Sequence, residues 1–286
     1  MRSKIIFLPI SFICIAMVAA SQNNLWSVQV VETSAAGNKL TPVNQAAPTA
    51  NALTITINPE QRFQKITGFG GSFTEASAYL LNKLSETNRD KILKAYFSEE
   101  GANYSLTRTH INSCDFSLSN YAYANVAGDK TLQHFSIDED RNDLIPMIKG
   151  AKKLSKEGFK IIASPWTAPP WMKDNNDWRG GKLLPEYRKT WALYFSKYIE
   201  AYKKEGIDIW AVTVENEPLG NDKNWESMHF SPEEMTEFVK DYLGPHFENN
   251  GLASVKILGY DQNRGEELEK WANVMYKDEA SSKYFD

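Results

Sequence analysis

Apolar runs alternate with amphipathic segments along most of the chain, from about residue 66 onward. The runs are short and rich in Ile, Val and aromatic residues, which is typical of strands, and the segments between them have helical periodicity. The pattern predicts strands at 65–71, 104–112, 159–166, 207–214 and 255–261. It predicts helices at 75–84, 86–97, 140–158, 185–206, 231–247 and 265–276.

Several helix ends carry their own signals. Gly158 and Gly206 follow two of the periodic segments, as glycine often does at the end of a helix. Ser231 is placed to cap the segment 231–247, with Pro232 in its first turn. These residues support the predicted boundaries.

The predicted strands are nearly continuous apolar runs, which indicates burial on both faces and therefore a parallel sheet. Strands that alternate with helices predict an α/β fold, either a doubly wound sheet or a (β/α) barrel. The chain contains about five β-α units, and an eight-stranded barrel needs eight. A sixth strand is expected to begin near 281–286, after the last helix.

The segment 22–65 has a different pattern and is expected to form N-terminal strands and a linker. An edge strand is predicted within 25–34 and a loop at 37–51. An alternating strand should follow, with a turn at Asn58-Pro59 and a second strand after it.

The first 21 residues are predicted to be a secretory signal peptide. Arg2 and Lys4 precede an apolar run, and small residues follow at 19–21. The run is too short for a stable membrane span, although a membrane anchor is the alternative interpretation. A secreted or periplasmic location is therefore expected. Removal of the signal would leave Cys114 as a single cysteine, so no intrachain disulfide is expected.

Composition narrows the class of partner. The 286 residues are 42% hydrophobic and 24% charged, with a net charge of −4. These values are typical of a globular protein, and without a long basic block nucleic acid is not an expected partner. The 8 Trp and 13 Tyr are numerous. Flat aromatic side chains suit a sugar-binding cleft, although they also fill large cores.

Polar and aromatic side chains recur where the predicted strands end. In parallel α/β folds the carboxyl ends of the strands carry the functional site. The candidate residues at these ends are Glu75, Arg108, His110, Trp166, Asn216, Glu217 and Asp261.

Asn216 and Glu217 stand out among these candidates. Glu217 precedes Pro218, so an extended backbone is expected. A partly desolvated carboxyl can keep a proton and act as a general acid. The Asn216 amide can both donate to and accept from a substrate hydroxyl. The alternative is that both residues cap a loop or join an ion-pair network.

A glycosidase needs a second carboxyl on the opposite face of the sugar. Glu215 lies on the same strand end as Glu217 and cannot easily flank the ring, so it is interpreted as a buried acceptor. Glu75 is another candidate, although an acid at a helix N-terminus is also explained by the helix dipole. Trp166 is expected to face a sugar, whereas Trp171 is expected to pack under its loop.

The sequence lacks the motifs of dinucleotide binding, metal binding, serine hydrolysis and nucleotide phosphate binding. The segment GFGGSF does not complete a dinucleotide-binding pattern, and the four His residues have no metal-ligand spacing. No nucleophile-elbow or phosphate-loop motif is present. No cofactor or metal is expected, and the sequence does not indicate an oligomeric state.

From about residue 58 the chain resembles glycoside hydrolase family 30, and within it the glucosylceramidases. The matching stretches, in chain order, are FQKITGFGGSFTEA, YFSEEGANYSLTRTHINSCDFS, ASPWTAPPWMK, TWALYFSKYIEAY and IWAVTVENEP. The resemblance implies a (β/α)8 TIM barrel, here truncated after about five units over 66–286, with the N-terminal strands belonging to a side β-domain.

The resemblance also implies a retaining β-glycosidase with site residues of known roles. Glu217 would be the general acid/base, and Asn216, Trp166, Glu75 and Arg108 would bind the substrate. The glucosylceramidases carry Asp where this chain has Glu75, which affects the choice of substrate. The substrate would be a β-glucoside, a glucan or a glycolipid.

The nucleophile of the family lies three β-α units beyond the acid/base, or about a hundred residues. Fewer residues than that follow Glu217, so the nucleophile is expected to be absent from this chain and the fragment to be inactive. The alternatives are an endo-β-1,6-glucanase of the same family and a non-catalytic carbohydrate-binding remnant.

Overall fold

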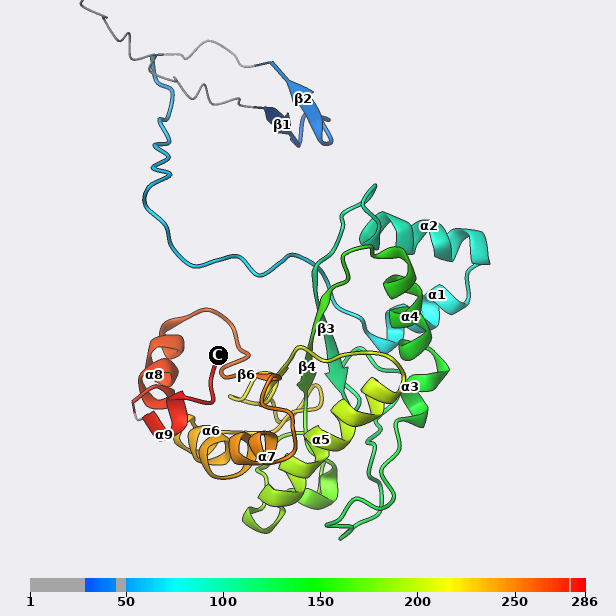
Figure 1. Cartoon of the computed structure of the whole chain (residues 1–286), viewed down its shortest axis with the longest axis vertical. Coiled ribbons are helices and arrows are strands. Elements are labelled where there is room, and N and C mark those ends of the chain that lie inside the picture. Colours follow the sequence, from blue (N-terminus) through cyan, green and yellow to red (C-terminus); the bar gives the residue numbers. More distant parts are fainter. Residues whose placement is uncertain (1–28, 45–49, 278) are drawn as a thin grey trace, which may run out of the picture. The chain divides into compact units, whose positions relative to one another are not determined.

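The computed structural model describes residues 29–44, 50–277 and 279–286 (Figure 1). The chain divides into two compact units, 1–64 and 65–286, and each is described by itself. The predicted signal peptide, 1–21, lies outside the described residues.

The first unit contains a small antiparallel hairpin. β1 (Val30–Glu32) pairs with β2 (Thr41–Val43), so a strand forms within the segment 37–51 that was expected to be a loop. The prediction of an alternating strand after residue 51 is wrong. Its apolar residues have no partner strand, and the side chain of Ile55 is 86% exposed. The turn at Asn58 is confirmed by a hydrogen bond of 3.2 Å from the Gln61 N–H to the Asn58 carbonyl.

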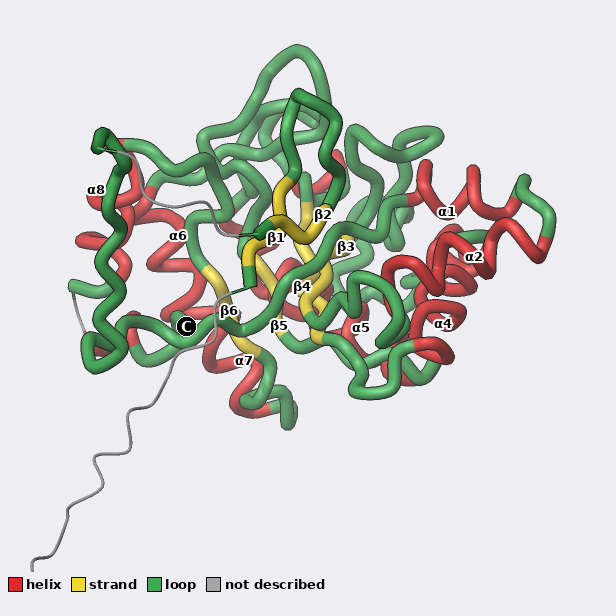
Figure 2. The backbone as a smooth tube through the Cα atoms, turned by 90° about the horizontal axis from the view of Figure 1, so that it is seen from above, coloured by secondary structure: helices red, strands yellow, loops and turns green. Residues whose placement is uncertain are grey.

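The second unit is built on a parallel sheet, as the sequence predicts, and the spatial order of its strands follows the chain (Figure 2). Its strands are β3 (Leu106–Ile111), β4 (Lys160–Pro165), β5 (Ala211–Thr213) and β6 (Lys256–Leu258). Each pairs in parallel with the next. Such an order, with a helical connection after each strand, is that of a (β/α) barrel.

The segment predicted as the first strand, 65–71, lies beside β3 without forming a regular strand. The Leu106 and Arg108 N–H groups donate to the Phe69 and Gly71 carbonyls at 3.2 Å each, and Ser72, the next residue, bridges Arg108. Phe73 N–H donates to the Arg108 carbonyl at 2.8 Å. Gly70 is in contact with β3, since a Cβ there would lie 1.7 Å from the Leu106 carbonyl oxygen. At the other edge, Phe285 bridges Ile257 where the sixth strand was expected.

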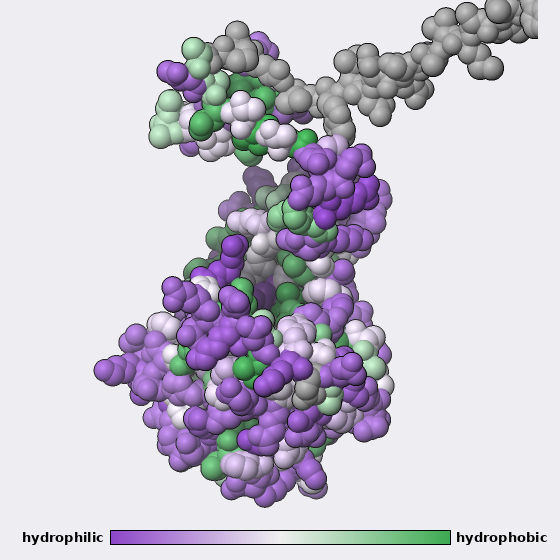
Figure 3. Space-filling model, turned by 90° about the vertical axis from the view of Figure 1, so that its left-hand side faces the viewer, coloured by the Kyte–Doolittle hydropathy of each residue, from purple (hydrophilic) through white to green (hydrophobic). Residues whose placement is uncertain are grey.

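Helices form the outer layer around the sheet (Figure 1). They are α1 (Glu75–Asn82), α2 (Glu86–Phe97), α3 (Asp138–Asn142), α4 (Leu144–Leu154), α5 (Arg188–Lys204), α6 (Pro232–Phe238), α7 (Gly244–Asn249), α8 (Glu266–Met275) and α9 (Glu279–Ser282). The second unit presents a largely hydrophilic surface in Figure 3. No helix in the described part of the chain is long and apolar enough to cross a membrane.

Two predicted helices are interrupted. The helix expected at 140–158 breaks at Asp143, whose backbone angles (φ −149°, ψ −49°) are not helical, and it ends at Leu154. The helix expected at 231–247 contains a π-helical turn, Val239–Leu243. Pro245 lacks the N–H that an α-helix would use at that point, and wider turns accommodate such a loss. The cap at Ser231 is confirmed as a full capping box with Glu234.

The inner face of α5 fills the core. Its fully buried residues are Trp191, Tyr194, Phe195, Tyr198 and Tyr202. The buried Asp140 accepts hydrogen bonds from the hydroxyls of Tyr121, Tyr123 and Tyr202 at 2.9, 2.6 and 2.7 Å. These bonds fasten the long connection between β3 and α4 to α5.

Candidate active site

The carboxyl ends of four strands meet around the guanidinium of Arg108. Its Nη2 donates to Asn216 Oδ1 at 2.7 Å and to Asp261 Oδ2 at 2.6 Å. Its Nε donates to Ser164 Oγ at 3.1 Å, and Ser164 in turn donates to Asp261 Oδ2 at 2.9 Å. One residue from each of four strand ends therefore shares a single network. The sequence placed Arg108, Asn216 and Asp261 there and missed Ser164.

Trp166 lies over this network. The Arg108 guanidinium carbon is 4.6 Å from the centre of the Trp166 ring, and the Trp166 residue is 8% exposed. The structural interpretation of Trp171 is confirmed. Its Nε1 donates to the Ala124 carbonyl at 2.9 Å, and its ring packs edge-on against Tyr187.

The bond to Arg108 limits what Asn216 can offer a ligand. Its amide oxygen already accepts from the guanidinium, so the amide Nδ2 is the group left to donate. The Asn216 backbone N–H donates to the Pro165 carbonyl at 2.7 Å. The Asn216 side chain is thus fixed in direction by two neighbouring strands.

Glu217 does not have the extended backbone that was predicted for it, because its φ is +50°. Two hydrogen bonds of 2.7 Å hold this conformation. The Glu217 N–H donates to the Asp261 carbonyl, and the Gly220 N–H donates to the Glu217 carbonyl. The tertiary bonds override the preference of a residue before proline. Left-handed backbone at a non-glycine residue is often found at functional sites. Glu217 is only partly buried, so a ligand can reach it.

Glu75 contacts His110 and is not hydrogen-bonded to the Arg108 network among the described residues. Its Oε2 accepts from the Leu118 N–H at 2.8 Å, and its own N–H donates to His110 Nε2 at 3.2 Å. His110 Nδ1 bonds the Asn112 carbonyl at 2.7 Å. Burial lowers the pKa of His110, so the ring is neutral with its proton on Nδ1. His110 therefore positions the first residue of α1.

Glu226 was not found from the sequence because it lies well inside the loop after β5. It is 6% exposed, and its Oε1 accepts from Asn120 Nδ2 at 2.5 Å. Its charge and that of Glu75 both raise the pKa of His110 against the larger effect of burial. Glu226 and Glu75 are therefore neighbours of the same imidazole.

Glu215 is fully buried, as predicted. The Met228 N–H acts on its carboxyl and lowers its pKa against the larger effect of burial, although neither carboxyl oxygen makes a hydrogen bond of regular geometry within the described residues. Burial raises the pKa of Glu215, and the nearby charge of Lys173 opposes this shift. A carboxyl with no exposed surface cannot serve as the second carboxyl of a glycosidase.

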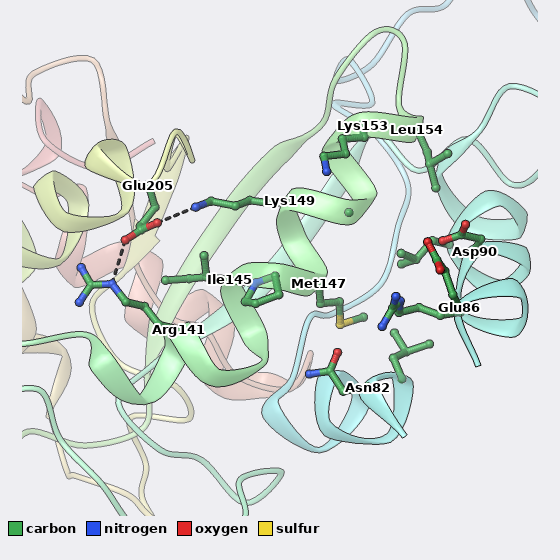
Figure 4. Close-up of a pocket in the computed structure, with 15 residues that line it drawn as sticks. Asn82, Glu86, Asp90, Arg141, Ile145, Met147, Lys149, Lys153, Leu154 and Glu205 are labelled. Atoms are coloured by element: carbon green, nitrogen blue, oxygen red, sulfur yellow. Dashed lines mark hydrogen bonds and ion pairs between the residues drawn. The ribbon is translucent and has the colours of Figure 1, made fainter. Parts of the chain in front are cut away.

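A groove of about 800 Å³ lies in the helical layer (Figure 4). It runs between α1, α2 and α4, and its wall includes Glu205, which pairs with Arg141 and Lys149 at 2.8 and 2.6 Å. None of the strand-end candidates lines it. Within the described ranges, no group of three or more His, Cys, Asp or Glu residues could hold a metal ion.

Comparison with known proteins adds a family and several relatives. Residues 66–286 match the family model of the glycosyl hydrolase family 30 TIM-barrel domain. The lysosomal acid glucosylceramidase of Mus musculus is 39% identical over 249 residues, which cover 84% of this chain and 48% of that protein. The chain spans about half the length of the curated relatives it matches.

Two solved structures superpose on the chain with a TM-score of 0.75. One is SrfJ from Salmonella typhimurium, at 40% identity, with 79% of this chain and 51% of that chain covered. The other is the endo-β1,6-glucanase BT3312, at 35% identity, with 87% and 56% covered.

Proposed function

The chain belongs to glycosyl hydrolase family 30, and on this premise we propose that it carries the general acid/base of a retaining β-glycosidase. The observation that supports the proposal is the position of Glu217. It directly follows Asn216 at the end of β5, beside the network of Arg108, Asp261 and Ser164. Glu217 is partly exposed as a residue, and its backbone is held by two short hydrogen bonds.

Retaining hydrolysis proceeds by two displacements. Glu217 would protonate the glycosidic oxygen while a second carboxyl attacks the anomeric carbon. Glu217 would then remove a proton from the water that releases the sugar. We expect the attacking carboxyl outside residues 1–286, so this chain by itself should show little or no turnover.

The residues around Glu217 suit a sugar. The Asn216 amide can donate to a hydroxyl, and the Trp166 indole offers a flat face beside it. Arg108 would act mainly by fixing Asn216, because its guanidinium is shared among three protein oxygens. Glu75 would contribute its free carboxyl oxygen to the same ligand.

We propose a β-glucoside of the glucosylceramide type as the substrate. The 39% identity to a glucosylceramidase supports this choice. The second candidate is β-1,6-glucan, since the chain also superposes on an endo-β1,6-glucanase at 35% identity. A secreted or periplasmic location, proposed from the pattern of residues 1–21, is compatible with either substrate.

Titration calorimetry with two probes tests the proposal. They are gentiobiose, a β-1,6-linked glucose disaccharide, and a glucosylceramide with a short acyl chain. Binding should be weakened in Asn216→Ala and unchanged in Asn224→Ala. Asn224 is an exposed residue of the loop after β5. The probe that binds more tightly identifies the substrate class. Binding of neither probe would refute the proposal, and any β-glucoside turnover that survives Glu217→Gln would refute the role of Glu217.

A further inference from the structure

A buried lysine connects the loops that surround Glu217. Lys173 is 2% exposed, and its ammonium donates to Thr167 Oγ1 at 2.8 Å, to the Gly180 carbonyl at 2.7 Å and to the Ser227 carbonyl at 3.0 Å. Thr167 follows Trp166 after β4, whereas Ser227 belongs to the loop after β5. The ammonium therefore uses all three protons, two within the loop after β4 and one to join that loop to the loop after β5.

Burial lowers the pKa of Lys173, and among the charged groups that oppose this shift the carboxyl of Glu215, fully buried at the end of β5, has the largest effect. Lys173 and Glu215 make no direct ion pair within 4.0 Å among the described residues. A single peptide group lies between them instead. The Ser227 carbonyl accepts from Lys173, and the N–H of the same peptide, on Met228, lies close enough to Glu215 to lower its pKa against the larger effect of burial.

This arrangement follows from peptide geometry. The C=O and N–H of a trans peptide point in opposite directions. An ammonium at the oxygen and a carboxyl oxygen near the N–H therefore both favour one orientation of the Ser227–Met228 peptide. Other charges face the two groups as well. Asp174 and Asp177 act on Lys173, and Asp261 acts on Glu215.

The orientation of this peptide is transmitted to Glu217 through two backbone contacts. The loop that contains Ser227 ends at Phe230, whose N–H donates to the Pro218 carbonyl at 2.9 Å. Pro218 directly follows Glu217, and Gly220 N–H closes the turn on the Glu217 carbonyl. A loop that moves at Ser227 would therefore change the direction of the Glu217 side chain.

We propose that Lys173 and Glu215 act together as positioning residues for Glu217, by holding the Ser227–Met228 peptide between an ammonium and a carboxyl. The pair sets the direction of the Glu217 carboxyl without touching the ligand. The inference rests on the proposed role of Glu217 as the acid/base. It assigns a purpose to two buried ionisable groups that the double displacement does not use.

The test compares Lys173→Met, Glu215→Gln and the double variant with the parent chain. Lys182→Met is the matched control, since Lys182 lies in the same loop and pairs with Glu234 at the surface. The main measurement is the ¹³C spectrum of glutamate-labelled protein, with the Glu217 carboxyl signal identified by Glu217→Gln. The affinity for gentiobiose and the free energy of unfolding are measured on the same samples.

Each single variant should shift the Glu217 carboxyl signal and should weaken gentiobiose binding by about tenfold. The double variant should change both by no more than the larger single variant does, since residues that act as one unit give non-additive effects. Lys182→Met should change neither. Should Lys173→Met fail to fold, the spectrum of Glu215→Gln, which keeps the side-chain volume, decides the question.

A Glu217 signal that is unchanged in the single variants, with only the free energy of unfolding lowered, would overturn the inference. It would show that the pair only stabilises the fold. A signal that shifts while the parent chain binds no sugar would leave the inference standing and refute the proposed function. The two proposals can therefore fail separately.

Discussion

Glu217 has a backbone conformation that residues other than glycine adopt at some energetic expense. Its φ of +50° is imposed by bonds from its own N–H to Asp261 and from Gly220 to its carbonyl. Left-handed backbone destabilises a residue with a Cβ by about 1 kcal/mol relative to glycine. The position of the proposed acid/base is therefore one at which function and stability oppose each other.

Glu217→Gly should raise the free energy of unfolding by up to about 1 kcal/mol, because glycine removes the strain at positive φ. Glu217→Gln keeps the Cβ and should leave the stability close to that of the parent. Urea unfolding of the three proteins measures the difference. A glycine variant no more stable than the glutamine variant would show that the conformation is not strained.

Arg108 should not tolerate replacement by lysine. Lysine keeps the charge but cannot bond Asn216, Asp261 and Ser164 at once, so Arg108→Lys should lower the free energy of unfolding by about 1–3 kcal/mol. Arg179→Lys is the control, since Arg179 makes an exposed pair with Asp177 at 3.6 Å and should be nearly neutral. Equal effects in urea unfolding would contradict the role assigned to the network.

At the scale of elements, buried polar contacts fasten irregular segments to regular ones. The connection between β3 and α4 contains few regular elements, and it is held to α5 through Asp140 and its three tyrosine hydroxyls. Burial raises the pKa of Asp140 to about 6, against the tyrosine hydroxyls, which lower it. The carboxyl is therefore an ionisable group within a packed interface.

The raised pKa predicts a pH dependence. The folded state holds the Asp140 proton more tightly than the unfolded state, so its contribution to stability is full below pH about 4 and is lost as the pH rises through about 6. The loss should reach about 2–3 kcal/mol. Asp140→Asn should lack this decrease. Urea unfolding between pH 4 and 7 gives the free energy of unfolding of the parent and of Asp140→Asn. If the two free energies change with pH in parallel, Asp140 is not the group responsible for the decrease.

The segment before α1 depends on glycine for its place beside β3. Gly70→Ala would put a Cβ 1.7 Å from the Leu106 carbonyl oxygen, so the segment must move and the protein should lose about 3 kcal/mol or more of stability. At Gly265 no atom lies within 4 Å of an added Cβ, so Gly265→Ala should be nearly neutral. Thermal unfolding of both variants measures the contrast.

At the scale of the whole molecule, the second unit exposes apolar surface beside α1 and α2. A groove of about 530 Å³ is lined mainly by apolar residues, and Leu80 in its wall is 62% exposed. Exposed apolar surface of this kind favours association. Leu80→Glu should reduce self-association in sedimentation velocity, whereas Leu268→Glu, at an exposed leucine of α8, should not. If both variants self-associate to the same extent as the parent, the groove does not mediate self-association.

Much of this architecture could be predicted from the sequence, because strands buried on both faces and amphipathic helices have strong periodic signals. The convergence of Arg108, Asn216 and Asp261 followed from the rule that parallel strands end at one edge of the sheet. The strand predicted after residue 51 does not form, because an alternating pattern by itself does not provide a partner strand. Local pattern also could not reveal the left-handed φ of Glu217 or the burial of Lys173, since both depend on contacts with distant loops.

The sheet order has a consequence for how the protein is made. Each of β4, β5 and β6 pairs with the strand that precedes it in the chain, and a helical connection follows each strand. A nascent chain that leaves the ribosome N-terminus first can therefore add one β-α unit at a time to a surface that is already formed. Synthesis and folding can therefore proceed in the same direction, because each strand can pair as soon as the next strand has been synthesised.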